Sequence, residues 1–121
     1  MEDRNYLILP VEGSELFKSY CAACHGVDAT GNGPAALALR NAVPDLTRIS
    51  QRNGGTFPTE RVKNYISGES AILSHGSREM PIWGPIFRQF DGDQELGEIR
   101  LHNVTVYIES LQKTQIESLQ K

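Results

Sequence analysis

The sequence predicts an all-α domain of about four to five helices joined by long loops. Apolar residues recur every three or four positions in several stretches, and no stretch of strand length alternates strictly between apolar and polar residues. The chain has 121 residues, which suits one domain, and only 39% of them are hydrophobic. Because the loops are long and the hydrophobic fraction is low, we expect a large apolar group to supply part of the core.

The first predicted helix covers about residues 11–24, where one apolar face repeats at helical spacing, and Pro10 stands just ahead of it. A glycine-rich stretch then interrupts the pattern. A short helical segment follows over residues 34–41, and Pro44 ends it. These boundaries predict a long, non-helical connection between the first and the next full helix.

Two further helices are predicted in the second half of the chain. One covers residues 59–67, with Thr59 as its N-cap and Gly68 as its stop. The other begins near Asp93 and is longer. Its predicted inward side consists of Leu96, Ile99, Asn103, Val104, Tyr107, Ile108 and Leu111.

We divide the chain into an N-terminal tail over 1–9, one domain over 10–113 and a C-terminal extension over 114–121. The hexapeptide of Ile108–Lys113 recurs at Ile116–Lys121. Because the second copy keeps its apolar residues near the same helical face, the extension is predicted to continue the last helix. The alternative is a neutral tandem duplication whose end frays.

Charge and hydropathy exclude two classes of partner. The net charge is -3 and the basic residues are scattered, so the sequence predicts no nucleic-acid surface. The longest aliphatic run, Leu7 to Leu9, is far shorter than the roughly 20 residues that span a bilayer, so we expect no direct membrane span in this chain.

Both cysteines of the chain lie in one pentapeptide, Cys21 to His25. Cysteines three residues apart on a helix project to the same side, so both can form thioethers along one edge of a porphyrin, and the adjacent imidazole can reach the iron. C-x-x-C-H is the attachment motif of c-type haem. The pentapeptide therefore predicts one covalently bound haem c, held by Cys21 and Cys24, with His25 as an iron ligand.

Three other interpretations of the pentapeptide explain less. A dithiol redox pair leaves His25 without a role and expects a βαβ context. A structural zinc site needs four ligands, commonly from two such pairs, and the chain has only 2 cysteines. A chance occurrence does not account for both cysteines falling inside a complete motif.

With this motif the chain resembles the class I c-type cytochromes, in particular the bacterial mono-haem cytochromes c, over about residues 11–112. The resemblance implies the cytochrome c fold, in which helices and long loops surround one haem. In that family a glycine and an aromatic residue precede the first cysteine on the first helix and pack against an aromatic residue of the last helix. Gly13, Phe17 and Tyr107 stand at the matching positions.

The second axial ligand decides between a closed and an open haem iron. The resemblance implies Met80, because the family's distal ligand is a methionine, often followed by proline, in the loop before the last helix. A thioether opposite histidine favours ferrous iron and leaves no site for substrate. A lone methionine is otherwise a common core filler. His75, in the same loop, is the alternative ligand, whereas His102 is expected to face solvent.

Several residues are candidates for contacts around the haem. A ligating histidine usually donates its other N–H to an acceptor, and in similar bacterial cytochromes c this is the carbonyl of a proline nine residues later, where Pro34 stands. The haem propionates need hydrogen-bond donors, and the candidates are Trp83, Arg48, Arg52 and Asn53. The stretch over residues 47–62 also resembles a recurrent bacterial pattern, to which we assign no further chemistry.

The predicted function is one-electron transfer in a respiratory or dehydrogenase chain, by exchange with redox partner proteins and without enzymatic activity. Haem c is attached outside the cytoplasm in bacteria, which predicts a periplasmic location and a leader or anchor absent from this chain. The chain can also be one domain of a larger membrane-bound complex. The alternative is a haem enzyme or a gas or ligand sensor with an open or exchangeable sixth site, where His75 and Arg78 act on bound oxygen species.

Overall fold

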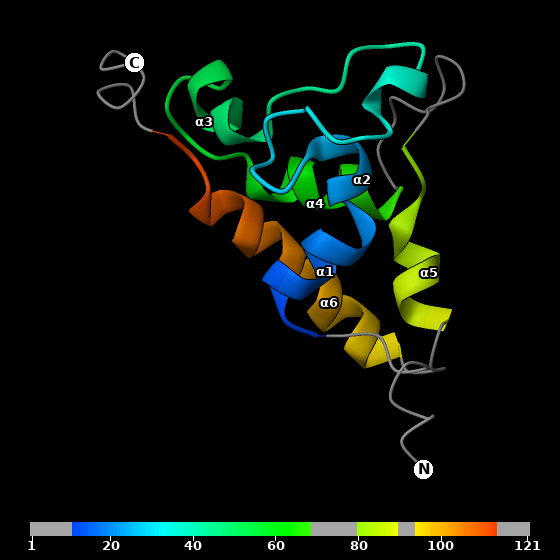
Figure 1. The fold of residues 1–121 in the computed structure, drawn as a ribbon. Helices are drawn as coiled ribbons and strands as arrows, with labels where there is room; N and C mark the ends of the chain where they lie inside the picture. Colours follow the sequence, from blue (N-terminus) through cyan, green and yellow to red (C-terminus); the bar gives the residue numbers. More distant parts are fainter. Residues whose placement is uncertain (1–10, 69–79, 90–93, 114–121) are drawn as a thin grey trace.

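The computed structural model describes residues 11–68, 80–89 and 94–113. Within these ranges every regular element is a helix, which confirms the all-α prediction (Figure 1). In chain order the elements are α1 (Gly13–Tyr20), α2 (Ala22–His25), the 3-10 helices η2 (Ala36–Ala38) and η3 (Leu46–Arg48), α3 (Ile49–Arg52), α4 (Thr59–Ser67), α5 (Trp83–Gln89) and α6 (Gln94–Ser110). None of the described helices is both long and apolar enough to cross a membrane. The predicted tail over 1–9 and extension over 114–121 lie outside the described residues.

Helices α1 and α6, from the two ends of the described chain, cross in close contact (Figure 1). Gly13 lies so close to α6 that a Cβ atom there would overlap the Asn103 carbonyl oxygen. The side-chain amide of Asn103 donates to the backbone carbonyl of Val11 at 2.9 Å. Phe17 is completely buried, with its ring centroid 5.5 Å from that of Tyr107. The packing of Gly13 and Phe17 on Tyr107, implied by the resemblance, is thus confirmed.

The predicted first helix is divided into α1 and α2 at Cys21. Cys21 has φ -116° and ψ -32°, which ends α1, yet the backbone hydrogen bonds continue across the break. The Cys21 amide donates to the Phe17 carbonyl and the His25 amide donates to the Cys21 carbonyl, both at 2.9 Å. The break turns the short helix α2 with respect to α1 without interrupting the chain of hydrogen bonds.

The middle of the chain is less helical than predicted. The expected helix over 34–41 is reduced to the single 3-10 turn of η2. Helix α4 has the predicted bounds and ends at Gly68, which has φ 94° and donates its amide to the last turn. The prediction that Thr59 caps α4 is wrong, because Pro58 occupies the cap position and no side chain caps this end.

Helix α5 has no counterpart among the predicted elements. Gly84 and Pro85 read as helix breakers in the sequence, but both lie in the first turn of α5, where backbone N–H groups have no intrahelical acceptor and proline is tolerated. Arg88 of α5 pairs with Glu98 of α6 at 2.8 Å and packs over Gly97, where a Cβ atom would overlap the Arg88 side chain. Glycine at position 97 thus lets the two helices approach closely.

Helix α6 buries a face that partly differs from the predicted one. Val104 and Ile108 are buried as expected, but Ile99 is 40% exposed and its neighbour Arg100 is completely buried. One guanidinium nitrogen of Arg100 donates to the Phe87 carbonyl at 3.2 Å, which supplies a polar partner inside the contact between α5 and α6. The expectation that Ile99 faces inward was wrong, because the inward face of α6 also contains a polar residue, Arg100, that apolarity does not indicate.

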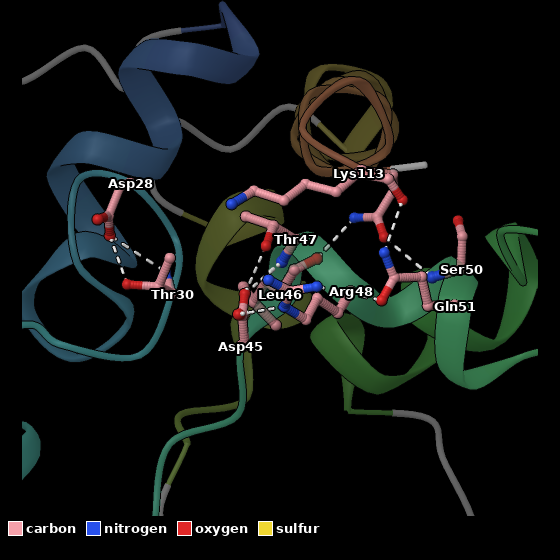
Figure 2. Close-up of polar contacts among 10 residues, drawn as sticks. Asp28, Thr30, Asp45, Leu46, Thr47, Arg48, Ser50, Gln51 and Lys113 are labelled. Carbon is pink, nitrogen blue, oxygen red and sulfur yellow. Dashed lines mark hydrogen bonds and ion pairs between the residues drawn. The ribbon is translucent and has the colours of Figure 1, made fainter. Parts of the chain in front are cut away.

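The end of α6 is tied to the segment that contains η3 and α3 (Figure 2). The Gln112 side-chain amide donates to the Leu46 carbonyl at 2.6 Å, and its oxygen accepts from the Ser50 amide at 2.9 Å. The Lys113 amide donates to the Thr47 carbonyl at 2.9 Å. These bonds connect residues far apart in the chain, and they fix a segment that contributes side chains to the site described next.

Candidate functional site

A cavity of about 630 Å³ lies among α1, α2, α3, α4 and the beginning of α5. Its volume falls within the roughly 300–1,000 Å³ typical of cofactor sites. The lining is mainly apolar and is drawn from every part of the described chain, from Phe17 on α1 to Ile108 on α6. Cys21, Cys24 and His25 line it together.

The two cysteines lie on the wall formed by α2 and the turn before it. Cys21 is buried and Cys24 is half-buried, and neither takes part in a disulfide. Burial, and to a smaller extent the neighbouring Cys24, raise the pKa of the Cys21 thiol to about 12. Dithiol redox enzymes instead lower the pKa of the attacking cysteine, so the buried Cys21 thiol does not suit that role.

His25, at the end of α2, is 8% exposed and belongs to the same wall. Desolvation lowers the pKa of His25, and the Pro44 carbonyl acts on the ring in the opposite direction. The imidazole is therefore favoured in its neutral form, which is the form that binds metals. Its Nδ1 atom is buried and meets hydrogen-bond geometry with no described residue. Two thiols beside such an imidazole form a donor set that fits haem c.

Of the two prolines that follow the motif in the loop, Pro44 lines the cavity and the predicted Pro34 does not. Pro34 is exposed, whereas Pro44 lines the cavity together with His25, and its carbonyl acts to raise the pKa of the ring. The backbone on both sides of Pro34 is bonded to α2 itself, with the Ala35 amide donating to the Ala23 carbonyl at 2.8 Å. These bonds hold the backbone around Pro34 against α2.

Met80 lines the same cavity as His25, although it comes from a distant part of the chain. It is half-buried and packs against the hydrophobic core. His102 is exposed on α6 and is not part of the cavity lining, as predicted. His75 and Arg78 lie outside the described residues. Among the described residues, Met80 is therefore the thioether that shares a cavity with the histidine of the motif.

Trp83 also lines the cavity and belongs to an aromatic cluster. Its ring lies edge-on to Tyr20, with centroids 5.5 Å apart, and stacks on Phe87 at 5.8 Å. Tyr20 and Phe87 contact each other edge-on at 6.1 Å. The cluster joins α1 to α5 and thereby fixes the segment that starts with Met80 against the rest of the cavity wall.

The predicted propionate partners are only partly brought together. Arg52 lines the cavity, but Arg48 does not and instead pairs with Asp45 at 3.3 Å. Asn53 is also absent from the lining, and its side chain accepts a hydrogen bond from Arg61 at 2.8 Å. Arg61 itself lines the cavity and was missed by the sequence analysis. Two features of the sequence could have indicated Arg61. It lies on the helix predicted over 59–67, and it belongs to the 47–62 pattern.

The described fold is all-α, with two cysteines, a histidine and a methionine around one apolar cavity. The cytochrome c family model matches residues 10–112, and the chain belongs to this family. No curated protein and no solved structure gave a match. The family binds covalently attached haem c with its iron and serves haem-based electron transfer. Its domains are typically electron carriers that act with redox partner proteins.

Proposed function

We propose that this protein is a one-electron carrier of the class I type, in which Cys21 and Cys24 hold haem c through thioether bonds. His25 and Met80 are the two axial ligands of the iron in this proposal. It rests on one observation, that a single apolar cavity is lined by both cysteines, His25 and Met80. The neutral imidazole favoured at His25 supports its part in the ligand pair.

This ligand set suits electron transfer better than catalysis. When bound, haem supplies an iron that alternates between the ferric and ferrous states. A thioether is a soft, neutral donor that favours ferrous iron and raises the reduction potential relative to harder ligands. The apolar lining excludes water, and two protein ligands leave no position for a substrate. The chain's residues then tune the potential and separate the iron from solvent.

The family also supports a location and a kind of partner. Bacterial c-type cytochromes are usually extracytoplasmic. We therefore infer a periplasmic carrier that exchanges electrons with donor and acceptor proteins of a respiratory or dehydrogenase chain. As a domain of a larger membrane-bound complex, the chain would perform the same transfer.

The visible absorption spectrum of the oxidised holoprotein tests the proposal. We expect the weak far-red band that arises from charge transfer between a thioether sulfur and ferric iron. The band should disappear in Met80→Ala, with a lower reduction potential because the soft donor is lost. It should persist in His75→Ala, the matched control for the alternative ligand.

Two outcomes contradict the proposal. If wild type lacks the band and His75→Ala changes the haem spectrum, His75 is the sixth ligand. If wild type lacks the band and binds added ligands such as cyanide readily, the sixth site is open and the enzyme or sensor function takes precedence. Haem-free protein from cells that attach haem c would reject the cofactor assignment itself.

A further inference from the structure

Two arginines contribute positive charge to the lining of the haem cavity. Among the described lining residues, the only side chains with a permanent positive charge are Arg52 and Arg61, and none is an aspartate or glutamate. Both arginines are exposed, so they stand where the cavity meets solvent. Haem is apolar except for its two carboxylates, which require solvent, cations or hydrogen-bond donors. The two arginines therefore mark the place that suits a carboxylate.

The Asn53 side chain fixes the position of Arg61. Its amide nitrogen donates to the Thr56 carbonyl at 2.8 Å, and its oxygen accepts from the Arg61 guanidinium at 2.8 Å. The two bonds determine the orientation of the amide, since the reversed orientation would set an oxygen against a carbonyl and an N–H group against a guanidinium. Asn53 thus connects the turn after α3 to the first turn of α4.

The identity of the partner matters for the charge of Arg61. Arg48 pairs with Asp45 and Arg88 pairs with Glu98, so carboxylates of the chain offset the charges of these two arginines. The partner of Arg61 is a neutral amide, which orients the guanidinium and leaves its full positive charge. Arginine has five N–H donors, so the bond to Asn53 leaves others for an anion.

The geometry points to Asn53 as a positioning residue that holds Arg61 at the rim of the cavity, where Arg61, beside Arg52, binds a haem carboxylate. The inference rests on the haem c of the family and does not depend on the identity of the sixth ligand. In this inference Asn53 acts on the haem carboxylate through Arg61 and not by direct contact. It also gives the 47–62 pattern a function, because this stretch carries both arginines, Asn53 and the turn that joins them.

The test measures the reduction potential of the holoprotein by redox titration. Arg61→Gln removes one positive charge at an exposed site, and we expect a lower potential because a nearby cation favours ferrous over ferric haem. Lys63→Gln is the matched control: it makes the same charge change two residues further along α4, at a side chain that does not line the cavity. The shift in Arg61→Gln should exceed the shift in this control and should shrink as ionic strength rises.

The role of Asn53 is tested by a double-mutant cycle. Asn53→Leu should lower the potential less than Arg61→Gln, because the arginine is present but no longer held. The double variant should have the same potential as Arg61→Gln alone, since Asn53 then has nothing left to position. Arg61→Lys should lie between wild type and Arg61→Gln, because it restores the charge without the planar fork of donors.

Distinct results overturn the two parts. If Arg61→Gln and Lys63→Gln shift the potential equally, Arg61 does not bind a haem carboxylate. If the shifts of Asn53→Leu and Arg61→Gln add in the double variant, Asn53 does not act through Arg61. The far-red band reports on the Met80 proposal independently, so its absence from wild type would reject that ligand while leaving the potential shifts interpretable.

Discussion

Gln112, just beyond the end of α6, offers a quantitative test of how the fold is held together. Its side chain makes two hydrogen bonds to the Leu46–Arg52 segment, through the Leu46 carbonyl and the Ser50 amide, and one to the Ile108 carbonyl. The Ile108 carbonyl also accepts from the Leu111 amide, so that bond is not the sole partner of its acceptor. The two long-range bonds carry the stabilisation, at about 1 kcal/mol each.

Replacing Gln112 by leucine removes both bonds at similar side-chain size. We expect the free energy of unfolding to fall by about 2 kcal/mol and the midpoint of thermal unfolding to fall by about 8 °C for a domain of this size. Far-UV circular dichroism of the holoprotein during heating and in guanidinium chloride measures both quantities. Glu109→Ala, at an exposed position one turn earlier on α6, is the control and should change stability by less than about 0.5 kcal/mol.

The refuting result is a Gln112→Leu protein as stable as the Glu109→Ala control. Water would then replace both long-range bonds without cost, and the tie between α6 and the segment with η3 would contribute nothing to stability. A loss well above 4 kcal/mol would contradict the estimate from the other side, because two neutral hydrogen bonds do not account for it.

Two further changes test other contacts. Gly13→Ala places a Cβ against the Asn103 carbonyl, so α1 must move away from α6, and we expect a loss of about 2 kcal/mol in denaturant unfolding; unchanged stability would show that the crossing adapts freely. Asp45 caps η3 and accepts from the Thr47 amide and hydroxyl. Partial burial acts to raise the pKa of Asp45, but the Thr47 bonds and Arg48 outweigh it, so this pKa lies below its ordinary value of 3.8. The stabilisation is then complete above pH 3.8 and lost as pH falls through the lower folded-state pKa. Asp45→Ala should therefore cost about 1 kcal/mol at pH 7 and less at pH 3, and a cost that does not change with pH would contradict the role of the carboxylate.

The local parts of the site could be predicted from the sequence, and the reason is geometric. Cys21, Cys24 and His25 lie within five consecutive residues at the start of and within α2, so their relative placement depends on the local backbone. The contact of Phe17 with Tyr107 was implied by the resemblance to the cytochrome c family, whereas periodicity alone placed Ile99 on the wrong side of α6. Where a pattern is set by backbone geometry, the sequence determines which side chains meet.

The parts that depended on loop paths could not be predicted. The place of Pro44 in the cavity lining depends on the path of the loop after α2, which no periodic pattern determines. The role of Arg61 depends on a turn that brings Asn53 back to α4, and neither residue has an apolar pattern that would place it. Helix α5 was missed because its first turn contains residues that usually end helices.

The segment from Leu46 to Arg61 connects stability with electrostatics in this protein. It supplies Leu46, Ile49, Arg52 and Arg61 to the cavity, and it is fixed at one end by Gln112 and near the other by Asn53. The two attachments differ in kind, because Gln112 bonds only to backbone groups whereas Asn53 orients a charge. Loss of the first should therefore appear mainly in the free energy of unfolding, and loss of the second mainly in the reduction potential. Measuring both quantities on both variants separates the structural use of this segment from its effect on the haem.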